Sequence, residues 1–245
     1  MERDDLVHKA LPLLIAARLY HRHEVVGLQN IPKQGRTLIV CNHSLATYDI
    51  ILLMTAMFQE LKRLPRPLID RLFFKVPYLG DLVTVFGAVK GSQENAEMLL
   101  NSDEIITVAP GGMREALRPS TQRYQIRWES RFGFVKLAMR THSPIVLAAC
   151  PKADDLYDVY PSYMTKWFYK TYKVPIFFAR GLGPTPLPRP VKLVHYLSEP
   201  MIPPKMPAGE GEAHDEEVEQ LARTFHAKLV TRMHELIADA IQHRS

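Results

Sequence analysis

The residue types in this chain best suited to chemistry are a histidine and an aspartate that follow an apolar run. Residues 37–40 are typical of a buried strand, and His43 and Asp49 come after them in a polar turn. Imidazole is the side chain best suited to take a proton from an alcohol near neutral pH. A carboxylate on its other ring nitrogen would fix the tautomer and stabilise the imidazolium. Because no serine or cysteine nucleophile motif accompanies them, the pair indicates a base that activates a hydroxyl of the substrate.

The spacing limits how this pair can meet. His43 and Asp49 are six positions apart, which on one helix is about 600° of rotation and puts them on faces about 120° apart. They meet only if His43 lies in the turn before a helix and Asp49 in its first turn, where a carboxylate suits the helix dipole. Thr47 would then be the N-cap. The same residues also fit a helix-capping aspartate beside an unrelated surface histidine.

A second motif has the same form, a buried strand that runs into a polar turn. Residues 105–109 are followed by Pro110 and by Gly111 and Gly112, which allow a ligand to approach the backbone closely. Arg114 carries a planar fork that suits phosphate or carboxylate, and Glu115 adds a carboxylate beside it. Alone, this motif also fits an ordinary connection from strand to helix with a surface ion pair.

Together the two motifs resemble the PlsC-type glycerolipid acyltransferase family, whose members carry a His-then-Asp box. The resemblance extends from about residue 25 to residue 200, with matching order and intervals. Its further blocks are residues 86–91, 128–138 and 143–146.

The departures from the family pattern concern the acceptor of the acyl group. Five residues separate His43 from Asp49, where the commonest box has four. Gly111 stands where the commonest third block has Glu, and Glu115 follows the Arg. Lys90 stands for the usual Arg of the second block. The form Pro-Gly-Gly-x-Arg-Glu-Ala-Leu resembles the branch near monoacylglycerol and diacylglycerol acyltransferases.

The resemblance implies transfer of a fatty acyl group from acyl-CoA to a hydroxyl of a glycerolipid, in phospholipid or triacylglycerol synthesis. The acceptor is a lysophospholipid or a mono- or diacylglycerol, and acyl carrier protein stays open as the donor. No metal and no cofactor are expected, with acyl-CoA a co-substrate. A thioester hydrolase and a non-catalytic lipid-binding or membrane-binding protein remain alternatives. The residues implied are His43 and Asp49 for catalysis, and Lys90, Gly111, Gly112, Arg114 and Glu115 for substrate binding.

Composition agrees with a globular protein that meets anionic partners. The 245 residues are 47% hydrophobic, enough for a sizeable core, and the formal net charge is +5. Phospholipid headgroups and the phosphates of coenzyme A fit this charge. Nucleic acid is disfavoured, since the chain has no zinc-finger spacing, RNA-binding aromatic motif or long basic block. Cys41 and Cys150 end apolar strands, which is typical of buried thiols without a disulfide framework.

Two segments suit a membrane surface. The longest apolar stretch, residues 10–17, lies between Lys9 and Arg18 and is shorter than the roughly 20 residues that cross a bilayer. Residues 1–24 are expected to form an amphipathic helix that dips into lipid or packs on the domain. Aromatic and basic residues interleave over 156–180, which fits a bilayer interface, an oligomer contact or a partly buried helix. The expected location is the cytoplasmic face of a membrane, peripheral or monotopic, without a transmembrane span.

The remaining pattern predicts an α/β fold, a mixed and largely parallel sheet flanked by helices, as in the glycerol-3-phosphate acyltransferase-like sandwich. Strands are expected at 25–28, 37–41, 105–109, 145–149 and 191–197, the first two as neighbours, with helices at 50–60 and 132–140. Residues 25–212 would be the acyltransferase domain and 213–245 an amphipathic helix packed on it. Both motifs then lie at carboxyl ends of strands, where ligands collect in such sheets.

Overall fold

A seven-stranded mixed sheet organises the protein, which is described here by a computed structural model that covers residues 3–70, 74, 80, 83–84, 87–160 and 178–242. The strand order is β1-β9-β6-β2-β5-β3-β4, and every neighbouring pair is parallel except β6 with β9. The predicted mixed, largely parallel sheet is therefore confirmed. The strands are β1 (Glu24–Val26), β2 (Thr37–Cys41), β3 (Arg66–Ile69), β4 (Val89–Lys90), β5 (Ile105–Val108), β6 (Ile145–Ala149) and β9 (Val194–Leu197).

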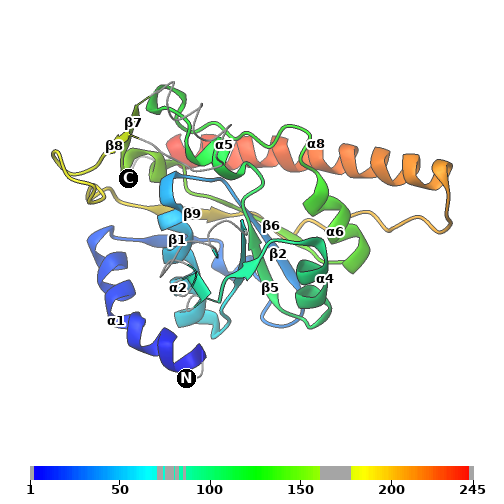
Figure 1. The fold of residues 1–245 in the computed structure, drawn as a ribbon, viewed down its shortest axis with the longest axis horizontal. Coiled ribbons are helices and arrows are strands. Elements are labelled where there is room, and N and C mark those ends of the chain that lie inside the picture. Colours follow the sequence, from blue (N-terminus) through cyan, green and yellow to red (C-terminus); the bar gives the residue numbers. More distant parts are fainter. Residues whose placement is uncertain are drawn as a thin grey trace.

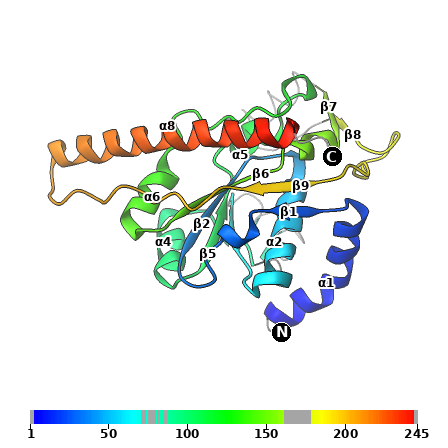
Figure 2. The same cartoon turned by 180° about the vertical axis from the view of Figure 1, so that it is seen from behind.

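Helices cover both faces of this sheet, and Figures 1 and 2 both show α8 and α1 on opposite sides of it. A small antiparallel ladder of β7 (Asp158–Tyr160) and β8 (Phe178–Arg180) stands apart from the main sheet. Of the aromatic segment 156–180, residues 161–177 lie outside the described part of the chain. The helices are α1 (Arg3–Tyr20), α2 (Tyr48–Leu61), α4 (Gln93–Asn101), α5 (Gly112–Ala116), α6 (Gly133–Thr141) and α8 (Glu212–Gln242).

The central strand β2 is buried along its whole length and feeds both layers of the core. Leu38 and Val40 pack with residues of α4, α6 and α8, while Ile39 and Cys41 pack with residues of α2. This alternation follows from the two-residue period of a strand. Because the side chains on both faces of β2 are buried, the strand that leads to His43 is fixed at the centre of the sheet.

The prediction that the first two strands are neighbours is wrong. β1 lies at one edge of the sheet and pairs in parallel with β9, so β9 and β6 stand between β1 and β2. The physical reason lies in the connection, which includes a short 3-10 helix at Leu28–Asn30. Its residues Leu28 and Ile31 are buried in the same cluster as the apolar side of α2. Burying these two side chains holds the connection against the sheet face, where a tight hairpin would leave them in water.

The first helix, α1, packs on α2 but also presents apolar side chains to solvent. Leu14 of α1 lines a hollow with Ile51 and Met54 of α2, while Leu13 is 75% exposed and Leu19 is 73% exposed. In the described ranges, no helix combines the length and the apolar character needed to cross a membrane.

The last helix, α8, is 31 residues long and lies along the opposite layer of the core. Its buried apolar residues recur at helical spacing and join the cluster formed by α4, α6 and the sheet. They are Ala222, Phe225, Leu229, Met233, Leu236 and Ile237.

Candidate active site

Three parallel strands at the centre of the sheet end side by side and bring the predicted motifs together. In the register of the sheet, Val40 of β2 lies opposite Val108 of β5, and Cys41 lies opposite Ala148 of β6. The histidine turn after β2 therefore meets the glycine turn after β5. On the other side of β2, Asn42 links the histidine turn to the end of β6. Its buried Oδ1 accepts the backbone N–H of Cys150 at 2.8 Å. The predicted position of both motifs at one edge is thus confirmed by the strand register.

The ring of His43 is held so that one nitrogen is ready to accept a proton. Its Nδ1 lies 2.8 Å from the backbone carbonyl of Ser44. Since a carbonyl can only accept a hydrogen bond, we assign the ring proton to Nδ1, which leaves the lone pair on Nε2. Burial lowers the pKa of His43, although the Ser44 carbonyl and the negative charge of Asp49 act to raise it. The ring is therefore neutral near neutral pH, as a general base must be.

Asp49 lies in the first turn of α2, as its spacing from His43 predicted, but its contacts differ from the expectation. Its Oδ1 accepts a hydrogen bond from the hydroxyl of Ser44, and its Oδ2 faces the ring of His195. Among the described residues, no hydrogen bond joins Asp49 to His43, because the Ser44 carbonyl occupies Nδ1. Asp49 therefore acts on His43 through the field of its charge. Thr47 precedes the helix with a φ of 57°, and its side chain makes no capping bond.

The backbone of His43 is clamped from both sides by buried charged groups. Its N–H donates to Oε1 of Glu115 at 2.6 Å, and its carbonyl accepts from Nη1 of Arg118 at 2.6 Å. The other oxygen of Glu115 accepts the backbone N–H of Arg127 at 2.7 Å. Arg118 in turn pairs with Asp154, which also accepts the backbone N–H of Tyr124. These bonds fix the position of the histidine main chain.

Glu115, expected at a substrate hydroxyl, is fully buried with 0% exposure and contacts the protein itself. Burial raises the pKa of its carboxyl, while the hydrogen bonds from the N–H groups of Arg127 and His43 and the charge of Arg118 act to lower it. Through Oε1 it holds the backbone N–H of His43. The sequence motif indicated a carboxylate at this turn, but it carried no sign of which way the side chain points.

The two predicted cations, Arg114 and Lys90, lie on different elements at the carboxyl edge of the sheet. Arg114, in α5 directly after the glycine turn, is exposed and pairs with Glu129 at 2.9 Å, so it is accessible to a ligand phosphate. Lys90 is exposed at the end of β4, separated from β5 by β3. It shares the carboxyl edge of the sheet with the other candidates, and within the described part of the chain no hydrogen bond or ion pair joins it to them.

The glycine pair has two different structural roles. Gly112 has a φ of 51°, which favours glycine, and its N–H donates to the carbonyl of Ala109 at 3.0 Å. Gly111 has a φ of −63°, which any residue adopts, and its carbonyl accepts from Arg131 at 2.6 Å. The turn is therefore pinned by Arg131, whose Nη1 also reaches the carbonyl of Pro110 at 2.8 Å.

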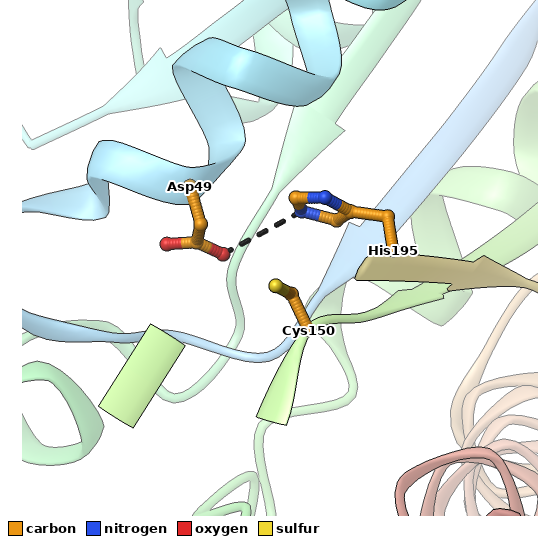
Figure 3. Close-up of side chains that lie close together, drawn as sticks. All are labelled: Asp49, Cys150 and His195. Carbon is orange, nitrogen blue, oxygen red and sulfur yellow. Dashed lines mark ion pairs between the residues drawn. The ribbon is translucent and has the colours of Figure 1, made fainter. Parts of the chain in front are cut away.

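Two buried histidines outside the two predicted motifs, His195 and His23, lie behind Asp49. His195 of β9 places Nε2 at 3.6 Å from Oδ2 of Asp49, and both residues are only 1% exposed. Figure 3 shows His195 and Asp49 facing each other, with the thiol of Cys150, the residue after β6, beside them. On the far side of the His195 ring, Nε2 of His23 lies 2.8 Å from Nδ1 of His195. A signal was present, since Leu193, His195 and Leu197 alternate inward along one strand.

Carboxylate, thiolate and imidazole are all ligand types that bind zinc. The donor atoms of Asp49, Cys150 and His195 lie within 4.8 Å of one another. Burial, and next the negative charge of Asp49, raise the pKa of the Cys150 thiol well above its usual value, so the group stays protonated.

Comparison with known proteins places this geometry in a sequence family. The model of the family described as "Acyltransferase" matches residues 22–150. A protein of Bos taurus named "DGAT1/2-independent enzyme synthesizing storage lipids" is 32% identical over 196 residues, which cover 79% of this chain and 57% of that protein. The Homo sapiens protein of the same name is 31% identical over 186 residues, 76% of this chain and 55% of that protein. The chain thus spans a little over half the length of these relatives.

A solved structure shares the fold. The crystal structure of the 1-acyl-sn-glycerophosphate acyltransferase PlsC from Thermotoga maritima aligns with a TM-score of 0.52. The alignment covers 93% of this chain and 81% of that chain, at 19% sequence identity. At this identity the match concerns the arrangement of helices and strands.

Proposed function

Because the chain belongs to the acyltransferase family, we propose that it transfers a fatty acyl group from acyl-CoA to a hydroxyl of a glycerolipid. The observation that carries this proposal is the state of His43. Its Nδ1 is engaged by the Ser44 carbonyl and its main chain is clamped by Glu115 and Arg118, so Nε2 is left to accept a proton.

His43 acts as the general base. As the hydroxyl oxygen of the acceptor attacks the thioester carbonyl carbon, Nε2 takes the hydroxyl proton and an oxyanion forms on the carbonyl oxygen. When the carbon–sulfur bond breaks, the thiolate of coenzyme A leaves and takes that proton from the imidazolium. The products are the ester and free coenzyme A. The negative charge of Asp49 stabilises the imidazolium between these steps.

The glycine turn contributes a donor for the oxyanion. The N–H of Gly112 already donates to Ala109, so within this pair the N–H of Gly111 is the one that remains for the developing charge. Arg114, which is exposed and close to the turn, binds a phosphate of coenzyme A. Lys90, on the same edge of the sheet, adds positive charge for the same ligand.

The acceptor that fits best is a neutral acylglycerol. The third block of this chain, with Gly111 and Glu115, resembles the branch near monoacylglycerol and diacylglycerol acyltransferases. The name of the bovine and human relatives, which refers to storage lipids, favours the same acceptor class. A lysophospholipid is the second candidate, favoured by Arg114, because the same guanidinium would bind a headgroup phosphate.

We also propose that the protein works at the cytoplasmic face of a membrane and that exposed apolar side chains hold it there. Leu13 and Leu19 of α1 and Leu187 of the loop after β8 are exposed apolar side chains. A hydrogen bond of 2.9 Å from the Tyr20 hydroxyl to the carbonyl of Pro188 joins the end of α1 to this loop. Leucines beside a tyrosine suit the boundary between lipid headgroups and acyl chains.

The test is transfer of labelled acyl groups by the purified protein to lysophosphatidate, lysophosphatidylcholine, monoacylglycerol and diacylglycerol. Acyl-CoA and acyl carrier protein would be compared as donors. His43→Ala is expected to lose about a hundredfold or more of the rate, as for loss of a general base. His234→Ala, a change of an exposed histidine on α8, is the control and should leave the rate unchanged.

Each other result assigns a different function. Label in phospholipid would replace the neutral acceptor with a lysophospholipid. Free fatty acid without acylated lipid would identify a thioester hydrolase, in which water replaces the alcohol at His43. No product from any donor, with lipid binding equal in wild type and His43→Ala, would identify a non-catalytic lipid-binding protein.

A further inference from the structure

A line of four side chains runs from the surface of α1 to the carboxylate behind the catalytic histidine. Nε of Arg18 lies 3.1 Å from Nδ1 of His23, and Nε2 of His23 lies 2.8 Å from Nδ1 of His195. Nε2 of His195 then faces Oδ2 of Asp49 at 3.6 Å. The four residues come from α1, the turn before β1, strand β9 and helix α2.

The direction of hydrogen-bond donation along these four side chains is set by Arg18, the residue at the outer end. A guanidinium is always protonated in a protein, so Nε of Arg18 donates and Nδ1 of His23 must accept. The proton of a neutral His23 is therefore on Nε2, which donates to Nδ1 of His195. His195 in turn carries its proton on Nε2, the atom that faces Asp49. One fixed donor thus determines the tautomer of two rings.

These hydrogen bonds require a single ring proton on each histidine. His23 and His195 are buried, and the pKa of His23 is lowered to about 2, chiefly by burial and further by His195 and the positive charge of Arg18. A doubly protonated His23 would also turn its Nδ1–H against the N–H of Arg18. The packing therefore admits one protonation pattern.

The inner end of the chain meets two atoms that have no other partner. In the described residues, Nε2 of His195 and Oδ2 of Asp49 are both buried and make no hydrogen bond, and they face each other at 3.6 Å. The second oxygen of Asp49 accepts from the hydroxyl of Ser44. The carboxylate is therefore approached by one donor on each oxygen.

We propose that His195, supported by His23 and Arg18, positions the Asp49 carboxylate for its action on His43. A carboxylate with a single donor can rotate about its side-chain bonds. A second donor from β9 fixes its plane, and with it the place of the negative charge that stabilises the His43 imidazolium. His195 touches no reacting atom and is a positioning residue. The kinetic part of this inference rests on the proposed acyl transfer, whereas the tautomer pattern does not.

The same chain argues against a metal ion in the cluster drawn in Figure 3. A metal between Asp49, Cys150 and His195 would need the lone pair of His195 on Nε2 and its proton on Nδ1. That proton would meet the Nε2–H of His23, unless His23 also changed tautomer. The changed His23 would then set its Nδ1–H against the N–H of Arg18. Each metal-binding arrangement therefore places two donors face to face.

Two substitutions of His195 separate positioning from packing. The amide nitrogen of Gln lies near the place of Nε2, so His195→Gln keeps a donor to Asp49. The amide of Asn reaches only the place of Nδ1, so His195→Asn keeps an acceptor for His23 and loses the donor. We expect His195→Asn to lower kcat about tenfold or more with the KM for acyl-CoA unchanged, and His195→Gln to retain kcat within about threefold. Melting temperatures would be measured for both.

A second measurement needs no activity. In protein labelled with 15N on its histidines, NMR of the imidazole nitrogens is expected to show His23 and His195 as neutral rings with the proton on Nε2. An Nδ1–H form of His195, or stoichiometric zinc in the purified protein by elemental analysis, would overturn the proposal. So would equal losses of kcat in the two variants in step with equal losses of melting temperature, or an unchanged kcat in His195→Asn. If the protein transfers no acyl group, the NMR result still tests the proposed tautomers of His23 and His195.

Discussion

The carboxylate of Glu115 fills the space that a side chain at Gly111 would need. A Cβ at residue 111 would lie 1.9 Å from Oε2 of Glu115 and 2.5 Å from its Cβ. The glycine is therefore required by space, since its φ of −63° is open to any residue. The resembled family most often carries Glu at the position of Gly111. This chain places a carboxylate at the same point of the turn but supplies it from one helical turn later.

This relationship predicts a strong coupling between the two positions. Gly111→Ala should lower stability and activity, because the added Cβ would displace Glu115 from the backbone N–H of His43. Glu115→Ala should cost about 1–3 kcal/mol by leaving buried N–H groups unpaired. In the double variant the clash with the carboxylate is gone and only the contact with the Cβ of residue 115 stays, so its loss of unfolding free energy should be smaller than the sum of the single losses. Urea unfolding of the four proteins measures this, and additive losses would contradict it.

The two arginines that follow the glycine turn should behave in opposite ways. Arg118→Ala leaves Asp154 as an uncompensated buried charge and releases the carbonyl of His43, so we expect a loss of about 3–5 kcal/mol in unfolding free energy. Arg114 is 59% exposed on its side chain. Arg114→Ala should change stability by less than about 1 kcal/mol and raise the KM for acyl-CoA. Thermal unfolding and steady-state kinetics together distinguish the two, and equal KM values for Arg114→Ala and wild type would remove Arg114 from the phosphate site.

The rate of acyl transfer should depend on pH through His43. Burial lowers the pKa of His43, so we expect kcat/KM to fall only below about pH 6.5, the usual value for histidine. The charge of Asp49 acts to raise this pKa. Asp49→Asn should therefore move the acidic limb to lower pH and reduce the maximal rate, since the imidazolium loses its stabilising charge. A limb that moves to higher pH would show that Asp49 does not act on His43 by its charge.

Stability should fall in mild acid because of His23. Its folded pKa is about 2 and its unfolded pKa is about 6.5, so between these values only the unfolded chain binds the proton. Stability is therefore full above pH 6.5 and is lost as pH falls, at about 1.4 kcal/mol per pH unit. From pH 7 to pH 5 this is about 2 kcal/mol. Urea unfolding at both pH values should give a smaller difference for His23→Gln than for wild type. Equal differences would show that His23 is not held neutral.

Membrane contact should depend on the outer side of α1. Leu13→Asp with Leu19→Asp should reduce flotation with liposomes, because both side chains are largely exposed and apolar. Met98→Asp is the matched control, since Met98 is also exposed but belongs to α4 in the other layer of the core. If flotation falls equally in the double leucine variant and in Met98→Asp, the protein adheres to liposomes through exposed apolar side chains in general and not through α1.

The sequence predicted those parts of the site that depend on local pattern. His43 and Gly111 each follow an apolar run, and strand ends in a parallel sheet meet at one edge, so the sequence predicted that both lie at that edge. The partners of these residues did not follow, because they depend on distant chain segments. Arg118 reaches the His43 carbonyl from 75 positions away, and His23 meets His195 across 172 positions. Those distances are set by the order of strands, which local pattern does not contain.

The pairing of β1 with β9 also has a consequence for how the protein is made. Glu24 lies opposite Val194, so about 170 residues must be synthesised after β1 before its sheet partner exists. At a ribosomal rate of ~5–20 residues per second this takes roughly 10–30 s. For that time β1 has no partner in the sheet. The strand β1 is thus the part of the sheet that pairs last, although it precedes the other strands in the chain.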